Sequence, residues 1–205
     1  MAQFLISDSM ARKKNASRKL REILPVVIGA GITEQWYFRH LKKMHGCRID
    51  VRPRFFGSDT AYDMEKLVEE VLSIGGKVIC VYDMDTTRTD AVEKERKEKF
   101  VAAYRANPSV ILCGSLPSIE YWFLLHFEKV NHYFASSEKV IEELKKYMLF
   151  EKTEKLLSKP GWVETLLADG RLQQAMRNAD ELGTDGESYT HIPDAIRFLE
   201  KHKKK

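Results

Sequence analysis

The chain has 205 residues, of which 43% are hydrophobic and 31% are charged, a balance typical of globular proteins. This length suits one domain with a well-formed core, and no apolar stretch approaches the ~20 residues that a membrane-spanning helix requires. The three cysteines show no Cys-x-x-Cys spacing, and Cys80 and Cys113 fall inside expected strands. We interpret these two as buried thiols and expect a cytoplasmic protein that does not enter a membrane.

The net charge of +4 is unevenly distributed. Residues 1–21 form a basic segment, and its positive side chains are Arg12, Lys13, Lys14, Arg18, Lys19 and Arg21. Such a segment can bind a phosphate backbone by counterion release. The alternative is a solvated tail without a partner.

Four short apolar runs alternate with segments of helical periodicity. The runs at residues 24–28, 49–56, 77–82 and 110–113 are expected strands, with helices between them and Thr33 as the N-cap of the first helix. This order predicts an α/β fold: a mainly parallel four-stranded sheet flanked by helices over residues 22–128. After Pro117 the pattern is helical to the end, so residues 129–205 are expected to form a helical portion packed on the sheet.

Two aspartates follow the third apolar run. Val78–Tyr82 has the composition of a buried strand, and Asp83 and Asp85 come at its carboxyl end. Ligands of open parallel sheets bind outside the carboxyl ends of strands, and alternation points both side chains the same way. Two such carboxylates repel each other unless a cation lies between them, and Mg²⁺ is commonly held by one or two carboxylates with waters and phosphates. A polar turn is the alternative interpretation.

Polar residues also follow the first and fourth expected strands. Gly29-Ala30-Gly31 leads into a helix that carries Glu34, and Ser115–Ser118 leads into an apolar helix that begins near Glu120. A glycine-bearing turn can bring a phosphate or a metal close to backbone amides, although neither a dinucleotide fingerprint nor a P-loop is present. Carboxylates that converge from separate strand ends suit two-metal phosphodiester chemistry. The alternative for Glu120 is stabilisation of a helix N-terminus, and His126 is interpreted as a packed core histidine.

Three segments together resemble the RloB family of bacterial defence proteins. They are residues 31–38, 81–85 and 115–127, and residues 147–153 and 189–199 also fit. The order of strand, glycine turn and strand-Asp-x-Asp is similar to the TOPRIM fold of topoisomerases, primases and overcoming-lysogenization-defect nucleases. The resemblance spans about residues 22–200 and is most specific at Glu120–Phe127.

This resemblance implies a TOPRIM-like, Mg²⁺-dependent (or Mn²⁺-dependent) nuclease and toxin effector of an anti-phage system, controlled by an ABC-type ATPase partner. By TOPRIM analogy Asp83 and Asp85 are metal ligands, Glu34 joins them, and Glu120 is a further catalytic candidate. A related TOPRIM effector cleaves transfer RNA, so RNA is an expected substrate, while DNA and a homodimer are left open.

Position 30 departs from the TOPRIM pattern. TOPRIM enzymes carry a glutamate after the first strand, often four residues before a second acidic residue, but Ala30 stands four residues before Glu34. Because that glutamate serves as metal ligand or general acid–base, its loss should remove much of the activity. Ala30 belongs either to a natural pseudo-enzyme or to an engineered inactive form. We favour engineering, since the other elements of the site are intact.

Two other functions are weighed against the nuclease. The first is a non-catalytic subunit that uses the same scaffold to bind an ATPase or a phage protein, with the charged helix at residues 90–105 as a contact surface. The second is a topoisomerase- or primase-like module, which is disfavoured because the chain supplies neither a tyrosine domain nor a polymerising region.

Overall fold

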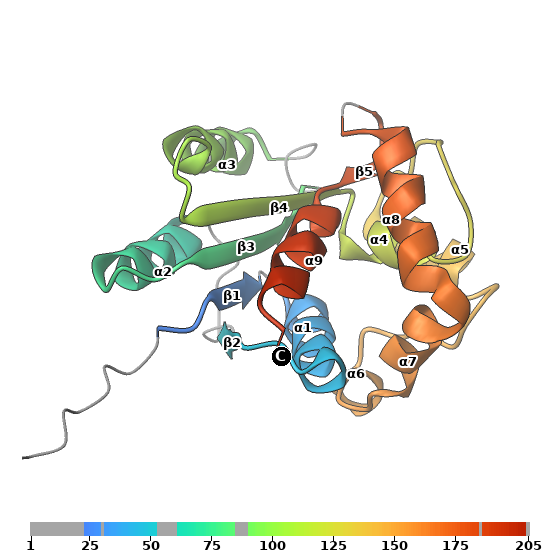
Figure 1. Ribbon diagram of the computed structural model, residues 1–205. Helices are drawn as coiled ribbons and strands as arrows, with labels where there is room; N and C mark the ends of the chain where they lie inside the picture. Colours follow the sequence, from blue (N-terminus) through green and yellow to red (C-terminus); the bar gives the residue numbers. More distant parts are fainter. Residues whose placement is uncertain (1–22, 30, 53–60, 85–89, 185, 204–205) are drawn as a thin grey trace, which may run out of the picture.

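The computed structural model describes residues 23–29, 31–52, 61–84, 90–184 and 186–203 (Figure 1). The basic segment at residues 1–21 lies outside these ranges. The elements, in chain order, are β1 (Val26–Gly29), α1 (Ile32–His45), β2 (Asp50–Arg52), α2 (Ala61–Ser73), β3 (Val78–Asp83), α3 (Ala91–Tyr104), β4 (Val110–Leu116), α4 (Ile119–Leu124), α5 (Ser137–Leu144), α6 (Glu154–Leu157), α7 (Gly161–Leu167), the 3₁₀ turn η2 (Ala168–Gly170), α8 (Arg171–Leu182), β5 (Tyr189–Thr190) and α9 (Ile192–Lys201).

The strands form one sheet in the order β2-β1-β3-β4-β5. β1 is parallel to β2 and to β3, and β3 is parallel to β4. The chain runs outward from β1 to β2 and then returns to place β3 on the other side of β1, so the strand order reverses at β1. In open α/β sheets the crevice outside the strand ends at such a reversal is the usual place for a ligand.

Alternation along the strands divides the core between the two faces of the sheet. Val26 and Ile28 of β1 pack with Val68 and Phe100 of α2 and α3, whereas Val27 faces the opposite side. That side is covered by α1, α9 and the helices after β4, as Figure 1 shows. The two-residue period of a strand therefore explains why both faces of this sheet are apolar and both are covered.

The prediction of a mainly parallel α/β sheet flanked by helices is confirmed, with two corrections. First, the sheet has a fifth strand: β5 pairs antiparallel with β4 through Thr190 and Tyr189, within the portion expected to be wholly helical. Two residues are too short to leave an alternating pattern in the sequence. Second, Gly31 and not Thr33 is the N-cap of α1, because the helix begins at Ile32 and Thr33 is buried in its first turn.

One apolar core joins the sheet to the helices that follow it. Val27 of β1 and Trp122 of α4 belong to the same cluster as Phe150, Trp162 and Leu199 from the C-terminal half. In the part of the chain that the structure describes, no helix has both the length and the apolar character needed to cross a membrane.

Candidate functional site

Asp83 ends β3 and is held by groups from two other elements. Its Oδ1 accepts a hydrogen bond of 2.9 Å from the backbone N–H of Ile119, the first residue of α4. Its backbone carbonyl accepts a hydrogen bond of 2.7 Å from Lys97 Nζ of α3. The backbone N–H of the next residue, Met84, donates to the carbonyl of Ser115 at the end of β4. Asp83 is thereby fixed at the carboxyl ends of two adjacent parallel strands.

Glu34 lies in the first turn of α1 and is buried. A Cβ atom placed on Gly31 would lie 2.6 Å from Glu34 Oε2, so the carboxylate extends across the space that a side chain at position 31 would fill. The φ of Gly31 is −134°, which any residue adopts, so the glycine is needed for space. From the sequence we expected that a phosphate or a metal could approach this glycine turn. In the structure the carboxylate of Glu34 fills the space beside Gly31.

Glu120 follows β4 and is fully buried. Ser118 Oγ donates a hydrogen bond of 2.7 Å to Glu120 Oε2, and Lys152 Nζ lies 3.1 Å from Glu120 Oε1. Both carboxylate oxygens are thus in contact with polar groups of this chain. Such a carboxylate is better placed to position Lys152 than to ligate an ion.

Lys152 is the residue that sequence reasoning missed. It lies between α5 and α6, in sequence far from each of the carboxylates that it meets. Burial lowers the pKa of its ammonium, but the ion pair with Glu120 and the charges of Asp83 and Glu34 outweigh burial and raise it above its usual value. Lys152 is therefore a firmly charged cation among the acidic groups. The one signal in the sequence was its place in residues 147–153, a segment that fits the RloB resemblance.

The three carboxylates lie close enough for their charges to act on one another. Burial raises the pKa of Asp83 well above its usual value, and the negative charges of Glu34 and Glu120 raise it further. The charge of Lys152 and the hydrogen bond from the Ile119 amide act in the opposite direction. The ionised form of Asp83 is therefore costly here, and a further cation beside it would stabilise that form.

The carboxylates of this cluster are the candidate ligands for a divalent cation. Within the described ranges no three His, Cys, Asp or Glu side chains are grouped so that they could hold one ion. Ser118 and Lys152 contact both oxygens of Glu120, which makes Glu120 a poorer candidate ligand than Glu34 and Asp83. Mg²⁺ in proteins is commonly coordinated by one or two carboxylates, and water and phosphate supply its other ligands. Of the other residues expected here, Asp85 and Ala30 lie outside the described residues.

Two polar residues near these segments have structural partners elsewhere. His126 is buried, with Nδ1 2.9 Å from the carbonyl of Trp122, and its ring packs edge-on against the Trp122 ring. The interpretation as a packed core histidine is confirmed. Asp90 caps α3 by accepting hydrogen bonds from the amides of Val92 and Glu93.

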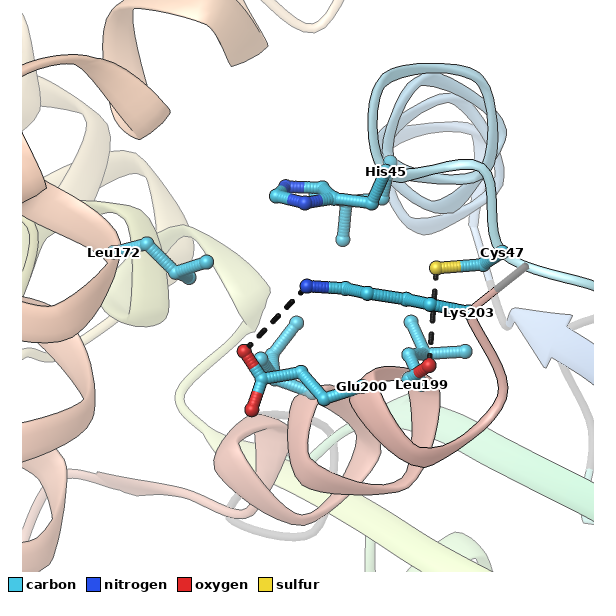
Figure 2. Close-up of a pocket in the computed structure, with 8 residues that line it drawn as sticks. His45, Cys47, Leu172, Leu199, Glu200 and Lys203 are labelled. Carbon is cyan, nitrogen blue, oxygen red and sulfur yellow. Dashed lines mark hydrogen bonds and ion pairs between the residues drawn. The ribbon is translucent and has the colours of Figure 1, made fainter. Parts of the chain in front are cut away.

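A small hollow lies at the other end of α1, away from the carboxylates (Figure 2). Its walls are mostly apolar, with His45, Cys47 and the ion-paired Glu200 and Lys203 at its rim. Its volume of about 10 Å³ is close to that of a single water molecule. His45 Nε2 is buried there and has no hydrogen-bond partner among the described residues, which suits one bound water.

Comparison with known protein families identifies the family of this chain. The model of the RloB-like protein family matches residues 25–199, which includes every described residue of the carboxylate site. No curated protein and no solved structure shows a significant match. Because the match covers most of the chain, from β1 into α9, this protein belongs to the RloB-like protein family.

Proposed function

We propose that this protein is a TOPRIM-type nuclease effector that depends on Mg²⁺ or Mn²⁺. The observation that supports this most directly is the convergence of Glu34, Asp83 and Glu120 on Lys152 at the carboxyl ends of parallel strands. The three carboxylates come from the starts of α1 and α4 and from the end of β3, so the fold itself brings them together.

The residues divide into two tasks in this proposal. Glu34 and Asp83 hold the cation, with Asp85 as the further ligand expected from the sequence. When bound, the cation stabilises charge on the oxygens of a phosphodiester and activates water. Lys152, positioned by Glu120, faces the phosphate and neutralises part of its charge. Ala30 occupies the position where a general acid–base glutamate is expected, which makes this form of the protein catalytically impaired.

The biological setting follows from the family resemblance. We propose an anti-phage effector that cleaves transfer RNA or another nucleic acid and is held inactive by a partner ATPase. The described residues add one compatible feature, since α3 presents a highly charged surface whose lysines and glutamates form ion pairs such as Lys99–Glu95.

The test compares the chain as it stands with Ala30→Glu and with Ala30→Glu combined with Asp83→Asn. Asparagine keeps the size of the side chain and the acceptor for the Ile119 amide, so the comparison isolates the charge. Each protein is incubated with Mg²⁺ or Mn²⁺ and transfer RNA, single-stranded DNA or duplex DNA, with and without the partner ATPase. Cleavage by Ala30→Glu alone is the expected result and identifies the substrate.

The second candidate is a non-catalytic subunit that binds an ATPase or a phage protein, and Ala30 is the observation that favours it. No cleavage by Ala30→Glu in the presence of the ATPase would contradict the nuclease and favour this candidate. Equal cleavage by the single and double variants would show that Asp83 holds no essential cation.

A further inference from the structure

Lys97 is a buried lysine on a helix whose neighbouring basic side chains are exposed. It is 8% exposed in α3, whereas Lys94, Arg96 and Lys99 of the same helix are exposed. Burial of an ammonium group is costly, and lysine is almost never fully buried unless it is paired. Lys97 Nζ donates its hydrogen bond of 2.7 Å to the backbone carbonyl of Asp83. This contact at the end of β3 is therefore the place to look for the reason for its burial.

The peptide group between Asp83 and Met84 is held at both ends. Its carbonyl oxygen accepts the hydrogen bond from Lys97. Its N–H donates to the carbonyls of Ser115, at 2.8 Å, and Pro117, at 3.2 Å. Because a peptide group is planar, donors and acceptors that fix its oxygen and its nitrogen also fix the rotation of the whole group. α3 and the end of β4 thus set the direction in which the Asp83 side chain leaves the backbone.

Lys97 approaches this peptide group from the face of the sheet opposite α1 (Figure 1). α3 packs on that face through Phe100, whose ring meets the ring of Tyr82 edge-on. Side chains alternate along a strand, so Asp83, which follows Tyr82, points to the α1 face, where Glu34 begins its helix. Lys97 therefore supports the backbone of Asp83 from the side away from Glu34.

We propose that Lys97 is a positioning residue of the cation site, which keeps the Asp83 carboxylate in the orientation that binds a divalent cation. This proposal rests on the proposed nuclease function and adds a residue outside the carboxylate cluster on which that function depends. Lys97 holds the backbone of Asp83, and the Ile119 amide holds its Oδ1, so both ends of the ligand are fixed before a cation binds.

Charge and position predict opposite effects of Lys97 on cation binding. A positive charge near a cation site repels the cation, so the charge of Lys97 by itself lowers the affinity for Mn²⁺. A group that orients a ligand raises the affinity, and loss of such a group typically costs about 10–100-fold in metal affinity. Removal of the ammonium should therefore tighten Mn²⁺ binding if Lys97 acts only by its charge, and weaken it if Lys97 positions Asp83.

Mn²⁺ binding to the chain as it stands, measured by titration calorimetry, tests this role without catalysis. Lys97→Met removes the ammonium and keeps an unbranched side chain of similar length. Lys94→Met removes the same charge from an exposed position of α3, and Phe100→Leu reduces the packing of α3 while Lys97 stays in place. The rise of the urea midpoint with added Mn²⁺ gives a second measure of affinity, so a variant of reduced stability can still be compared.

Lys97→Met should weaken Mn²⁺ binding at least about tenfold, although it removes a repelling charge. Lys94→Met should bind Mn²⁺ within about twofold of the parent, because an exposed charge is screened. Phe100→Leu should also stay within about twofold, even where it lowers the urea midpoint, because independent sites are close to additive.

Equal or tighter Mn²⁺ binding by Lys97→Met would overturn the positioning role and leave the nuclease function standing. A loss of affinity in Phe100→Leu as large as that in Lys97→Met would also overturn it, because any loosening of α3 would then have the same effect. Absence of Mn²⁺ binding by the parent would overturn the cation site, and with it both proposals.

Discussion

Lys152 and Glu120 show how one contact between distant residues determines the character of a site. Glu120 is fully buried, and a buried carboxylate is tolerated only when polar partners compensate for lost hydration. Ser118 and Lys152 supply that compensation, and the same contact directs the Lys152 ammonium toward Asp83 and Glu34. The stability of the site and the position of its cation therefore depend on the same pair.

Replacement of Lys152 by Met should destabilise the protein, because Glu120 would keep its burial and lose its counterion. Removal of one partner of a buried pair costs about 3–5 kcal/mol, and since Lys152 is 37% exposed we expect a smaller loss of about 1–3 kcal/mol in the free energy of unfolding. Urea denaturation measures it, with Lys155→Met as the exposed control. In a Glu120→Gln background the same change should cost much less, and equal costs in both backgrounds would contradict the pairing.

His126 should make stability depend on pH. Burial lowers its pKa to about 4, below the usual value of 6.5, although its hydrogen bonds to the backbone carbonyls of Trp122 and Phe123 act the other way. The folded protein therefore binds fewer protons at this residue than the unfolded chain, so stability is full above about pH 6.5 and falls as the pH drops toward 4. At pH values below both pKa values, the loss in the free energy of unfolding due to His126 is on the order of 3 kcal/mol.

Urea denaturation of the parent and of His126→Phe at pH 7 and pH 4.5 isolates this effect from that of the carboxylates. Phenylalanine keeps a ring against Trp122 and cannot be protonated. The parent should lose more stability than the variant between the two pH values. An identical loss in both would show that His126 does not remain neutral in the folded state.

At the scale of elements, the turn from β1 into α1 depends on two glycines for different reasons. A Cβ at Gly31 would meet the movable end of Glu34, at Oε2, whereas a Cβ at Gly29 would lie 2.8 Å from Glu34 Cβ and 3.4 Å from the backbone N of Gln35. The first conflict can be relieved by rotation of one side chain, and the second requires a shift of the helix against the strand. Gly31 therefore leaves room for the Glu34 carboxylate, and Gly29 allows α1 to pack closely against β1.

Gly31→Ala and Gly29→Ala should accordingly separate function from stability. We expect Gly31→Ala to change the free energy of unfolding by less than about 1 kcal/mol but to weaken Mn²⁺ binding, since Glu34 must turn away. Gly29→Ala should lower stability by more than Gly31→Ala does. Titration calorimetry with Mn²⁺ and urea denaturation measure the two effects, with Gly161→Ala as a control at a position with open space. Undiminished Mn²⁺ affinity in Gly31→Ala would exclude Glu34 as a ligand.

Periodicity in the sequence predicted the elements that repeat over several residues and missed those that do not. β1, β3 and β4 and helices α1 to α3 were identified because apolar runs and helical spacing extend over four residues or more. β5 was missed because it has only two residues, which form a strand through their antiparallel pairing with β4 and leave no pattern of their own in the sequence. The site follows the same rule: Glu34, Asp83 and Glu120 each follow a strand and could be identified, whereas the contacts of Lys152 and Lys97 join segments that are separate in the sequence.

At the scale of the whole molecule, one core connects the sheet to everything that follows it. Trp122 donates a hydrogen bond to the Tyr37 hydroxyl, and Phe123 packs against Trp162 of α7. The imidazole of His40 in α1 lies 2.8 Å from the carbonyl of Leu157 in α6. Helices from both halves of the chain thus share buried partners, so neither half has a complete apolar interior alone.

We therefore expect the full chain to unfold in a single cooperative transition, and a fragment of residues 22–128 to remain unfolded. The fragment would expose the faces of α1 and α4 that pack on α6 and α7. Far-ultraviolet circular dichroism and tryptophan fluorescence should report coincident transitions for the full chain. A cooperative transition in the fragment would show instead that the sheet domain folds independently.

The backbone of Cys47 forms an isolated antiparallel β-bridge with that of Lys203, which affects how the protein can be immobilised on a surface. This bridge holds the end of α9 beside the C-terminal end of α1, as the position of the C-terminus in Figure 1 also shows. The fourteen residues of α1 extend for about 20 Å between that point and Glu34. A tether or fusion partner attached after Lys203 would thus be anchored at the end of α1 opposite Glu34, and immobilised molecules would present the carboxylate edge to the solution.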